Sequence, residues 1–591
     1  MKSKKPVSKI TDTQRVLGCL KGKAIGGTLG TPHEGKMKLM DLTFYDPVPT
    51  GILPNDDFDL QLLFLEAVEN AGGVVDTMTL ARTWIEKVQF PWDEYGVANL
   101  NIRRGFKPPV TGWFDNPFKH CMGSPIRSEM WALLAPRRPA LAAYFAMQDA
   151  MIDHSTEGMA GEMFFAAFES AAFDGGSMDD LIATGLAYTP KNSITYRAVR
   201  FALDNYKKFD WPVLREKILE QFGHPNFTEA PQNIAFTIIG LLYFPNDFDK
   251  ALLSTTNCGY DTDCTAATIG AMWGVMYGDN FPERWLKPIG ENVLASHGVV
   301  DMSVAATLTK LAVDIERVRG IVAKRYAKVT DAKLKAMTQA TLAEPGKMKI
   351  DQNSDITIDY GKSPVLNGTK KIPFTGAIKK VFTKQPFSAS IKGKAILLNL
   401  DKKAPFYPTH VKVTAETADG SQYEFALVTA HEMWIGTPAS PDAFASLASS
   451  PFDALAKDGK VKPFTLDERL FLLKDLPDAE WLHLGGHIHL GSYGKYRLAA
   501  YAECPVQGFL DGVQVMNEAE GAACIPAPHR GGKPGMIHDA ELKGGWHRWD
   551  VFLNKKKAIR EGKVTLVLAY AYDKQLIDFK FRRSNAGVYA H

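Results

Sequence analysis

CGYDTDCTAATIGAMWG, residues 258–274, runs from a glycine-containing loop into a helix of small residues through two aspartates, Asp261 and Asp263. Acidic residues are common in the first turn of a helix, because the helix dipole favours anions there. Capping explains less well why two aspartates alternate inside a stretch flanked by apolar residues. Buried like charges are costly unless something compensates them. The stretch therefore predicts either an acidic helix start or one half of a metal site.

A second acidic block, PNDDFD at 54–59, comes directly before an apolar run. Asn55 is suited to cap a helix, and Asp56 and Asp57 fall in its first turn. If the two blocks meet in space, their carboxylates converge and need cations to remain ionised. Oxygen ligands without clustered His or Cys favour Mg²⁺, Mn²⁺ or Ca²⁺ over Zn²⁺. Adjacent carboxylates at two helix starts suit a two-ion site.

Helical periodicity extends well beyond these blocks. Apolar residues recur at the spacing of an α-helix over most of residues 12–345. Near the start, glycine recurs at every fourth residue, at Gly18, Gly22, Gly26 and Gly30. Because glycine costs about 1 kcal/mol relative to alanine inside a helix, this repeat indicates a smooth face against which another backbone packs closely.

The pattern changes in the second part of the chain. Residues 346–365 lose the helical periodicity and are interpreted as a linker. Over 366–591, short alternating strands such as HVKVTAE and VTLVLAYAY are separated by turns. The sequence predicts a multidomain protein, with an all-α domain over 12–345 and a β-sandwich accessory domain of the jelly-roll kind over 366–591.

The composition is that of an average globular protein. The 591 residues are 45% hydrophobic and 23% charged, which excludes a disordered, collagen-like or coiled-coil chain. A net charge of +3 does not indicate nucleic acid or an anionic membrane as a partner. Six cysteines are too few for a disulfide scaffold. The lysine-rich start MKSKKPVSK is not followed by the apolar core of a signal peptide, and we expect a cytoplasmic protein.

Four segments, in order along the chain, resemble the motifs of the ADP-ribosylglycohydrolase family, the all-helical dinuclear magnesium hydrolases. They are GCLKGKAIGGTLGTPHEG (18–35), NDDFDL (55–60), CMGSPIRSEMWALLAP (121–136) and GYDTDCTAATIGAMWG (259–274). They are similar to the family's first helix with its glutamate, its Thr-Asp-Asp-Thr motif, its glycine-rich loop and its Asp-Thr-Asp-Thr motif. The resemblance implies the family's fold for this part of the chain.

The resemblance also implies a set of ligands for two Mg²⁺ ions, with Mn²⁺ as an alternative. The set is Asn55, Asp56, Asp57, Asp261, Asp263 and Cys264. Asn55 and Cys264 stand where the family usually has hydroxyl side chains. The amide oxygen of Asn55 can coordinate a cation, but a thiol is a poor Mg²⁺ ligand, so the contact of Cys264 would be lost, weakened or replaced by water. The resemblance also implies that Asp56 and Asp57 act in catalysis together with Glu34. Glu34 matches a glutamate to which the family assigns an acid/base or substrate-gating role. The alternative is that Glu34 is an exposed loop residue.

Four further residues are substrate-binding candidates by the same resemblance. Gly123 and Ser124, followed by Arg127, would cradle a diphosphate or distal ribose with backbone N–H groups. The alternative is an ordinary helix cap with Arg127 in a surface ion pair. His154 is either a ligand contact or a structural histidine.

The resemblance implies a metal-dependent hydrolase of an N- or O-glycosidic bond to ADP-ribose, whose partner is small-molecule or protein-conjugated ADP-ribose. The β-rich half motivates an alternative, a glycoside hydrolase of the same fold that acts on another furanoside or glycan. A third hypothesis is a metal-bearing protein that binds ADP-ribose without turnover, because Asn55 and Cys264 depart from the family pattern.

Overall fold

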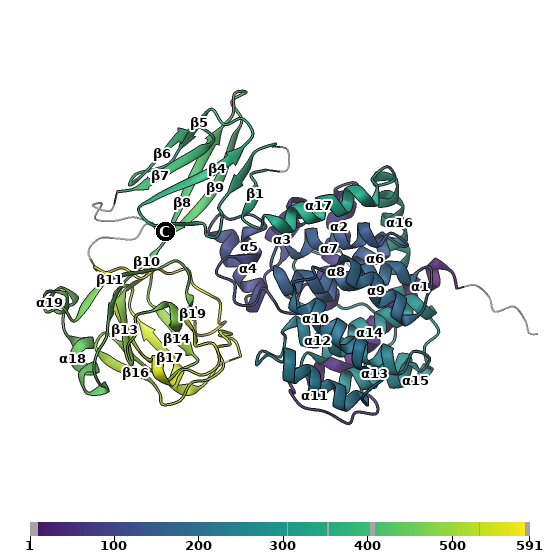
Figure 1. Cartoon of the computed structure of the whole chain (residues 1–591). Coiled ribbons are helices and arrows are strands. Elements are labelled where there is room, and N and C mark those ends of the chain that lie inside the picture. Colours follow the sequence, from purple (N-terminus) through teal and green to yellow (C-terminus); the bar gives the residue numbers. More distant parts are fainter. Residues whose placement is uncertain (1–9, 304, 352–353, 402–407, 531, 586–591) are drawn as a thin grey trace, which may run out of the picture. The chain divides into compact units, whose positions relative to one another are not determined.

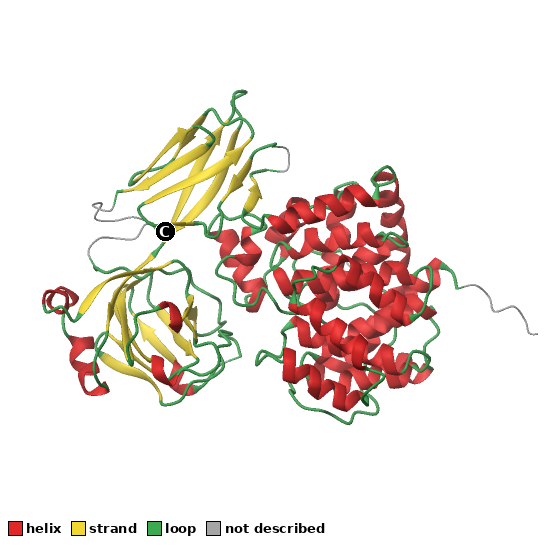
Figure 2. Ribbon diagram, in the orientation of Figure 1, coloured by secondary structure: helices red, strands yellow, loops and turns green. Residues whose placement is uncertain are grey.

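The computed structural model describes residues 10–303, 305–351, 354–401, 408–530 and 532–585. The lysines of the N-terminal segment MKSKKPVSK lie outside these residues. The first part of the described chain is helical and the second part is rich in antiparallel strands (Figures 1 and 2), so the predicted fold class is confirmed. Among the described residues, no helix combines the length and the apolar character needed to cross a membrane.

The helical part contains α1 to α17. Their bounds are Asp12–Gly30, Asp56–Asn70, Thr77–Lys87, Asp93–Arg103, Val110–Trp113, Ser128–Leu134, Pro139–Ala150, Thr156–Ala172, Met178–Tyr188, Ile194–Asn205, Trp211–Phe222, Ala230–Tyr243, Phe248–Asn257, Thr262–Tyr277, Glu283–Ile289, Leu308–Arg325 and Asp331–Ala343. By packing, the described residues form two compact units. One holds the residues up to Gln89 together with Phe118–Glu344, and the other holds Phe90–Pro117 together with the residues from Pro345 onward.

Helices α1 and α14 form the closest packed pair around the acidic blocks. The predicted glycine face of α1 lies directly against the backbone of α14. A Cβ built on Gly22 would lie 1.9 Å from the carbonyl oxygen of Gly270, and one on Gly26 would lie 1.9 Å from that of Ala266. The glycine repeat thus permits a contact that no larger residue allows, and this contact sets where α14 begins relative to α1.

The first β module of the second unit has two sheets. The five-stranded sheet has the order β1-β2-β4-β7-β6, with bounds Lys347–Lys349, Thr357–Asp359, Thr369–Thr375, Ala395–Leu400 and Phe387–Lys392. The four-stranded sheet has the order β3-β9-β8-β5, with bounds Val365–Leu366, Gln422–Thr429, His410–Glu416 and Lys380–Phe382. In β8, alternate residues Val411, Val413 and Ala415 are buried, as expected for strands with one face on a core.

The second β module also has two sheets. The six-stranded sheet has the order β11-β10-β13-β18-β15-β16, with bounds Val461–Leu466, His431–Gly436, Trp481–Leu490, Gly545–Asn554, Val506–Leu510 and Val513–Glu518. The four-stranded sheet is β12-β19-β14-β17, with bounds Leu470–Leu472, Lys563–Tyr570, Gly494–Ala502 and Ile537–Leu542. Two short helices, α18 (Phe444–Ser449) and α19 (Phe452–Lys457), precede β11. Each module has its own hydrophobic core.

The segment Phe90–Pro117, which carries α4 and α5, packs with the β-rich residues of its unit. Phe106, Val110 and Phe114 belong to the core of the first β module. Arg104 donates to Asp578 at 3.0 and 3.1 Å. Asp115 accepts from the side chain of Arg469 at 2.7 Å. Buried charges need such partners, so these contacts and the shared core make Phe90–Pro117 part of the β-rich unit.

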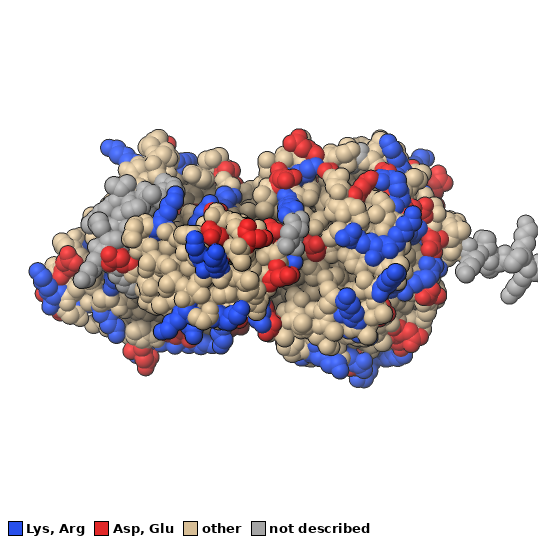
Figure 3. Space-filling view, turned by 90° about the horizontal axis from the view of Figure 1, so that it is seen from above, with Lys and Arg blue, Asp and Glu red and all other residues tan. Residues whose placement is uncertain are grey.

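Surface charge is mixed. On the face shown in Figure 3, basic and acidic side chains are interspersed over both the helical and the β-rich parts. This agrees with the net charge of +3 and gives no single-sign field on that face.

Candidate metal centre

The two acidic blocks lie side by side in the helical unit. Asn55 caps α2, and its side-chain oxygen accepts from the backbone N–H of Asp57 at 2.8 Å. Its amide nitrogen donates to Oδ2 of Asp263 at 3.3 Å. Asn55 therefore links the start of α2 to the start of α14, and its oxygen is engaged by the cap.

Two loops place Glu34 beside the start of α14. Gly35 N–H donates to the carbonyl of Tyr260 at 2.9 Å, and Tyr260 N–H donates to the carbonyl of Lys36 at 3.0 Å. Gly259 has a φ of +74°, and a Cβ there would lie 2.4 Å from the carbonyl oxygen of Lys36. Only glycine fits this turn, so Gly259 permits the close approach of the loop that carries Glu34 to the start of α14.

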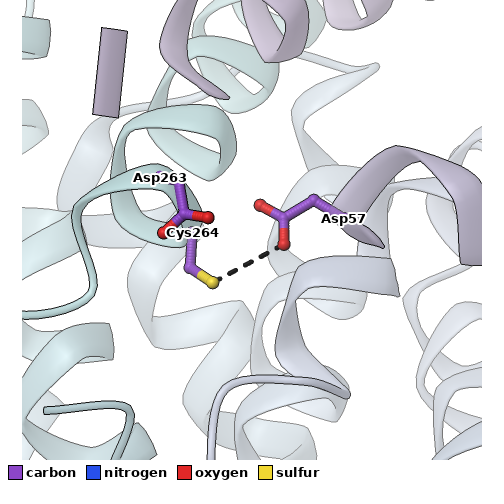
Figure 4. A group of neighbouring side chains, drawn as sticks. All are labelled: Asp57, Asp263 and Cys264. Carbon is purple, nitrogen blue, oxygen red and sulfur yellow. Dashed lines mark hydrogen bonds between the residues drawn. The ribbon is translucent and has the colours of Figure 1, made fainter. Parts of the chain in front are cut away.

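The ligand-type atoms fall into two overlapping groups. Atoms of Asp57, Asp263 and Cys264 all lie within 4.8 Å of one another, and so do atoms of Glu34, Asp261 and Asp263. Figure 4 shows Asp57 reaching from α2 toward Asp263 and Cys264 of α14. Because Asp263 belongs to both groups, the two candidate cation positions would be adjacent and would share one carboxylate.

The buried oxygens of this centre fit a cation. Oδ2 of Asp57, Oδ2 of Asp261 and Oδ1 of Asp263 are buried and have no hydrogen-bond partner among the described residues. Burial, and next the Asp263 carboxylate, raise the pKa of Asp261 well above its usual range. Burial also raises the pKa of Asp57, with Asp263 adding to the effect and Lys23 opposing it. Carboxylates that resist ionisation in this way are stabilised as anions by bound cations.

Asp56 lies in the first turn of α2 and is partly exposed. It belongs to neither of the two groups, so its place as a metal ligand stays a prediction. The same holds for Asn55 as a ligand, because its oxygen already accepts from a backbone N–H.

A buried lysine beside the centre is not among the residues predicted from the sequence. Lys23 of α1 donates to both carboxylate oxygens of Glu129 at 3.2 Å and to the carbonyl of Ile126 at 2.9 Å. Gln61 of α2 donates to the same carbonyl at 2.9 Å and to Glu129. The sequence feature that could have indicated a buried Lys23 is its position inside a helix of glycine and small apolar residues.

The glycine-rich loop is buried, and Arg127 holds it from inside. The guanidinium donates to the carbonyl of Gly123 at 2.8 Å and pairs with Asp149 and Asp153 at 2.9 and 2.8 Å. It is fully buried. The hydroxyl of Ser124 is buried without a hydrogen-bond partner among the described residues. Direct substrate contact by these residues stays a prediction; what the structure describes is a loop fixed by Arg127.

His154 is buried at the end of the same network. Its Nδ1 lies 2.9 Å from the Asp153 carboxylate, which Arg127 also binds. A Cβ on Gly158 would lie 2.6 Å from the His154 ring, so the imidazole packs tightly against the start of α8. His154 is thus placed within the Arg127 network rather than in the two ligand groups.

A small pocket lies beside Asp57. Its lining includes Lys23 and Asn55 on the polar side. The larger apolar side chains that line it are Ile52, Leu53, Phe58, Val293, Leu294 and Leu308. The pocket thus places apolar side chains beside the polar groups of Lys23, Asn55 and Asp57.

The chain has counterparts among known proteins. A model of the family "ADP-ribosylglycohydrolase" matches residues 8–322, more than half of the chain. No curated protein matches it. Among solved structures it is similar to an "ADP-ribosylglycohydrolase-related protein complex", at 17% identity and a TM-score of 0.37, over 53% of this chain and 98% of that one. It is also similar to an "anti-sigma factor domain-containing protein", at 10% identity and a TM-score of 0.17, over 37% and 84% of the two chains.

Proposed function

Because the chain belongs to the ADP-ribosylglycohydrolase family, we propose that it is a metal-dependent hydrolase that cleaves an N- or O-glycosidic bond to ADP-ribose. One observation supports the proposal above others. Buried carboxylate oxygens that find no hydrogen-bond partner in the described part of the chain converge from the starts of α2 and α14. Such an arrangement is costly for a protein that holds no cation there, and it suits a metal centre that binds vicinal hydroxyls.

In this proposal Asp57, Asp261 and Asp263 hold the cations, and Asp56 completes the set of ligands. The cations are Mg²⁺ or Mn²⁺, because these metals prefer oxygen ligands. Bound divalent cations supply Lewis-acid polarisation of ribose hydroxyls and of water. Asn55 orients the centre, since it joins the N-terminus of α2 to Asp263. The close backbone contact between α1 and α14 fixes the start of α14, which carries Asp261 and Asp263, relative to α1.

Glu34 is the proposed acid/base. It is exposed, and it lies within 4.8 Å of ligand atoms of Asp261 and Asp263. Cleavage at an anomeric carbon passes through an oxocarbenium-like transition state, which a nearby carboxylate stabilises while it transfers a proton between water and the leaving group. Because Glu34 is exposed and lies at the edge of the buried ligand group, its carboxylate has access to both the water and the leaving group.

The loop Gly123–Arg127 is proposed to position the substrate rather than to react with it. Arg127 fixes the carbonyl of Gly123 from the interior. The Ile126 carbonyl accepts hydrogen bonds from Lys23 of α1 and Gln61 of α2. A loop fixed from two sides keeps its backbone geometry when a ligand binds, which is the basis of preorganised recognition.

The test is calorimetric titration of ADP-ribose into the reduced protein, first with Mg²⁺ and then with EDTA. We expect binding with Mg²⁺ and its loss with EDTA, followed by release of ADP-ribose from a conjugate. Binding without turnover on any conjugate would support a binding protein. No binding in either buffer, together with hydrolysis of an aryl furanoside, would overturn ADP-ribose as the substrate class.

A further inference from the structure

Cys264 brings sulfur into the carboxylate centre. Its thiol donates to Oδ1 of Asp57, with Sγ and Oδ1 3.5 Å apart. Sγ lies within 4.8 Å of carboxylate oxygens of both Asp57 and Asp263 (Figure 4). Cys264 directly follows Asp263 in the first turn of α14, and the ligand atoms of both residues lie within 4.8 Å of each other.

An independent observation points to a cation at this place. Oδ2 of Asp57 and Oδ1 of Asp263 have no hydrogen-bond partner among the described residues. The two residues are 2% and 6% exposed. The nearby ammonium of Lys23 donates to Glu129 and to the Ile126 carbonyl, so these oxygens are open to a metal ion.

Building on the metal centre of the proposed function, we propose that Cys264 is itself a metal ligand and that the position between Asp57, Asp263 and Cys264 prefers Zn²⁺ to Mg²⁺. Thiolate is a favoured ligand of Zn²⁺ and a poor ligand of Mg²⁺. In a tetrahedral zinc site, sulfur and oxygen ligands lie about 3.6 Å apart, close to the observed 3.5 Å. On binding, the S–H bond breaks, the sulfur electron pair forms the bond to the metal, and the proton leaves to solvent.

The other position differs in its chemistry. Glu34, Asp261 and Asp263 offer oxygen atoms, which suit Mg²⁺ or Mn²⁺. The two positions share Asp263, yet only one has sulfur. The centre is therefore built for two unlike cations, with the sulfur-containing position deeper, since Cys264 and Asp57 are buried and Glu34 is exposed.

Cobalt(II) is the probe that distinguishes a sulfur ligand from oxygen ligands. The full chain is reduced, freed of metal and titrated with Co²⁺, and the absorption spectrum is recorded. A thiolate ligand gives an intense near-ultraviolet charge-transfer band, whereas oxygen ligands give weak visible bands alone. We expect the band in the wild type and its loss in Cys264→Ser, which still binds Co²⁺ through its carboxylates. The preference for Zn²⁺ over Mg²⁺ should fall roughly tenfold or more in that variant.

Cys258→Ala is the matched control. Cys258 is also buried and precedes α14, but its thiol donates to the carbonyl of Ser254 at 3.3 Å, so the band should persist. Co²⁺ binding without a charge-transfer band in the wild type would overturn the role of Cys264 and leave the metal centre standing. Absence of any metal binding by the folded wild type would overturn both this inference and the proposed function.

Discussion

Gly22 of α1 and Gly270 of α14 contact each other backbone to backbone. A Cβ on Gly22 would lie 1.9 Å from the Gly270 carbonyl oxygen, and a Cβ on Gly270 would lie 2.1 Å from the Gly22 carbonyl oxygen. Neither position therefore has room for a side chain, because the backbone of the other glycine fills the space. Gly270 lies seven residues after Asp263 on α14, about two helical turns, so the contact fixes the distance between α1 and the helix that carries Asp263.

Gly22→Ala should destabilise the helical unit by about 3 kcal/mol, the upper range for overpacking a rigid contact, because neither backbone can move independently. Gly320→Ala is the control. Gly320 is exposed in α16 and a Cβ there meets nothing within 4 Å, so alanine should be neutral or stabilising by up to about 1 kcal/mol. Thermal unfolding monitored by circular dichroism checks both. Equal midpoints for the two variants would contradict the close approach.

Lys23→Met should destabilise the helical unit by about 3–5 kcal/mol, since it leaves the buried Glu129 carboxylate without its cation. The double variant Lys23→Met/Glu129→Gln should recover much of that loss, because the uncompensated charge is then removed as well. Denaturant unfolding of both variants measures the difference. Strictly additive losses would show that the two side chains do not act as an ion pair.

Asp263→Asn should weaken binding at both cation positions, because Asp263 is shared by the two ligand groups. We expect at least about a hundredfold loss of metal affinity, the upper range seen even for outer-shell changes, and loss of turnover with it. Asp59→Asn is the matched control, since Asp59 is a buried aspartate of α2 that accepts from the N–H of Ser296 at 3.0 Å. Calorimetry with Mg²⁺ and Mn²⁺ compares them. Unchanged metal affinity in Asp263→Asn would contradict the shared ligand.

The stability of the β-rich unit should rise with pH through Lys580. Burial lowers the pKa of Lys580 from its ordinary value of 10.5 to about 7, with Arg104 and Arg582 adding to the effect and Asp578 and Asp115 opposing it. At a pH between these two pKa values, Lys580 is protonated in the unfolded chain and neutral in the folded chain, so raising the pH favours folding. Below pH 7 this group adds no further change.

Lys580→Met should remove that slope, which reaches about 1.4 kcal/mol per pH unit. Lys556→Met keeps it, because Lys556 is exposed and pairs at the surface with Glu480 at 3.9 Å. Unfolding midpoints of the three proteins between pH 7 and 10 provide the measurement. Parallel curves for the wild type and Lys580→Met would show that Lys580 keeps an ordinary pKa in the folded protein.

Local sequence patterns were enough to predict the helical and β-rich halves and the close approach of α1. The four-residue glycine repeat predicts a helix face against which another backbone packs closely, and the structure confirms this contact at Gly22 and Gly26. The two acidic blocks could be predicted to form a metal site, because buried like charges are costly unless a cation compensates them. Their convergence also depends on the turn at Gly259, whose positive φ is visible in the sequence only as a glycine.

Other features depend on which elements meet, and periodicity does not carry that information. Phe106, Val110 and Phe114 enter the core of the first β module, and their local sequence does not say which strands cover them. In the same way, Arg127 reads as a loop arginine until Asp149 and Asp153 are brought to it by α7 and the loop that follows. The ion pair of Lys23 with Glu129 joins helices that are distant in sequence.

The attachment of Phe90–Pro117 to the β-rich residues means that the two units are interleaved in the gene. A fragment ending near Glu344 would still encode Phe106, Val110 and Phe114 but would lack the strands that cover them. Conversely, a fragment starting at Pro345 would begin without part of its own core. No single stop codon or start codon separates the units, so an expression library of simple truncations should yield aggregated products on both sides of the cut.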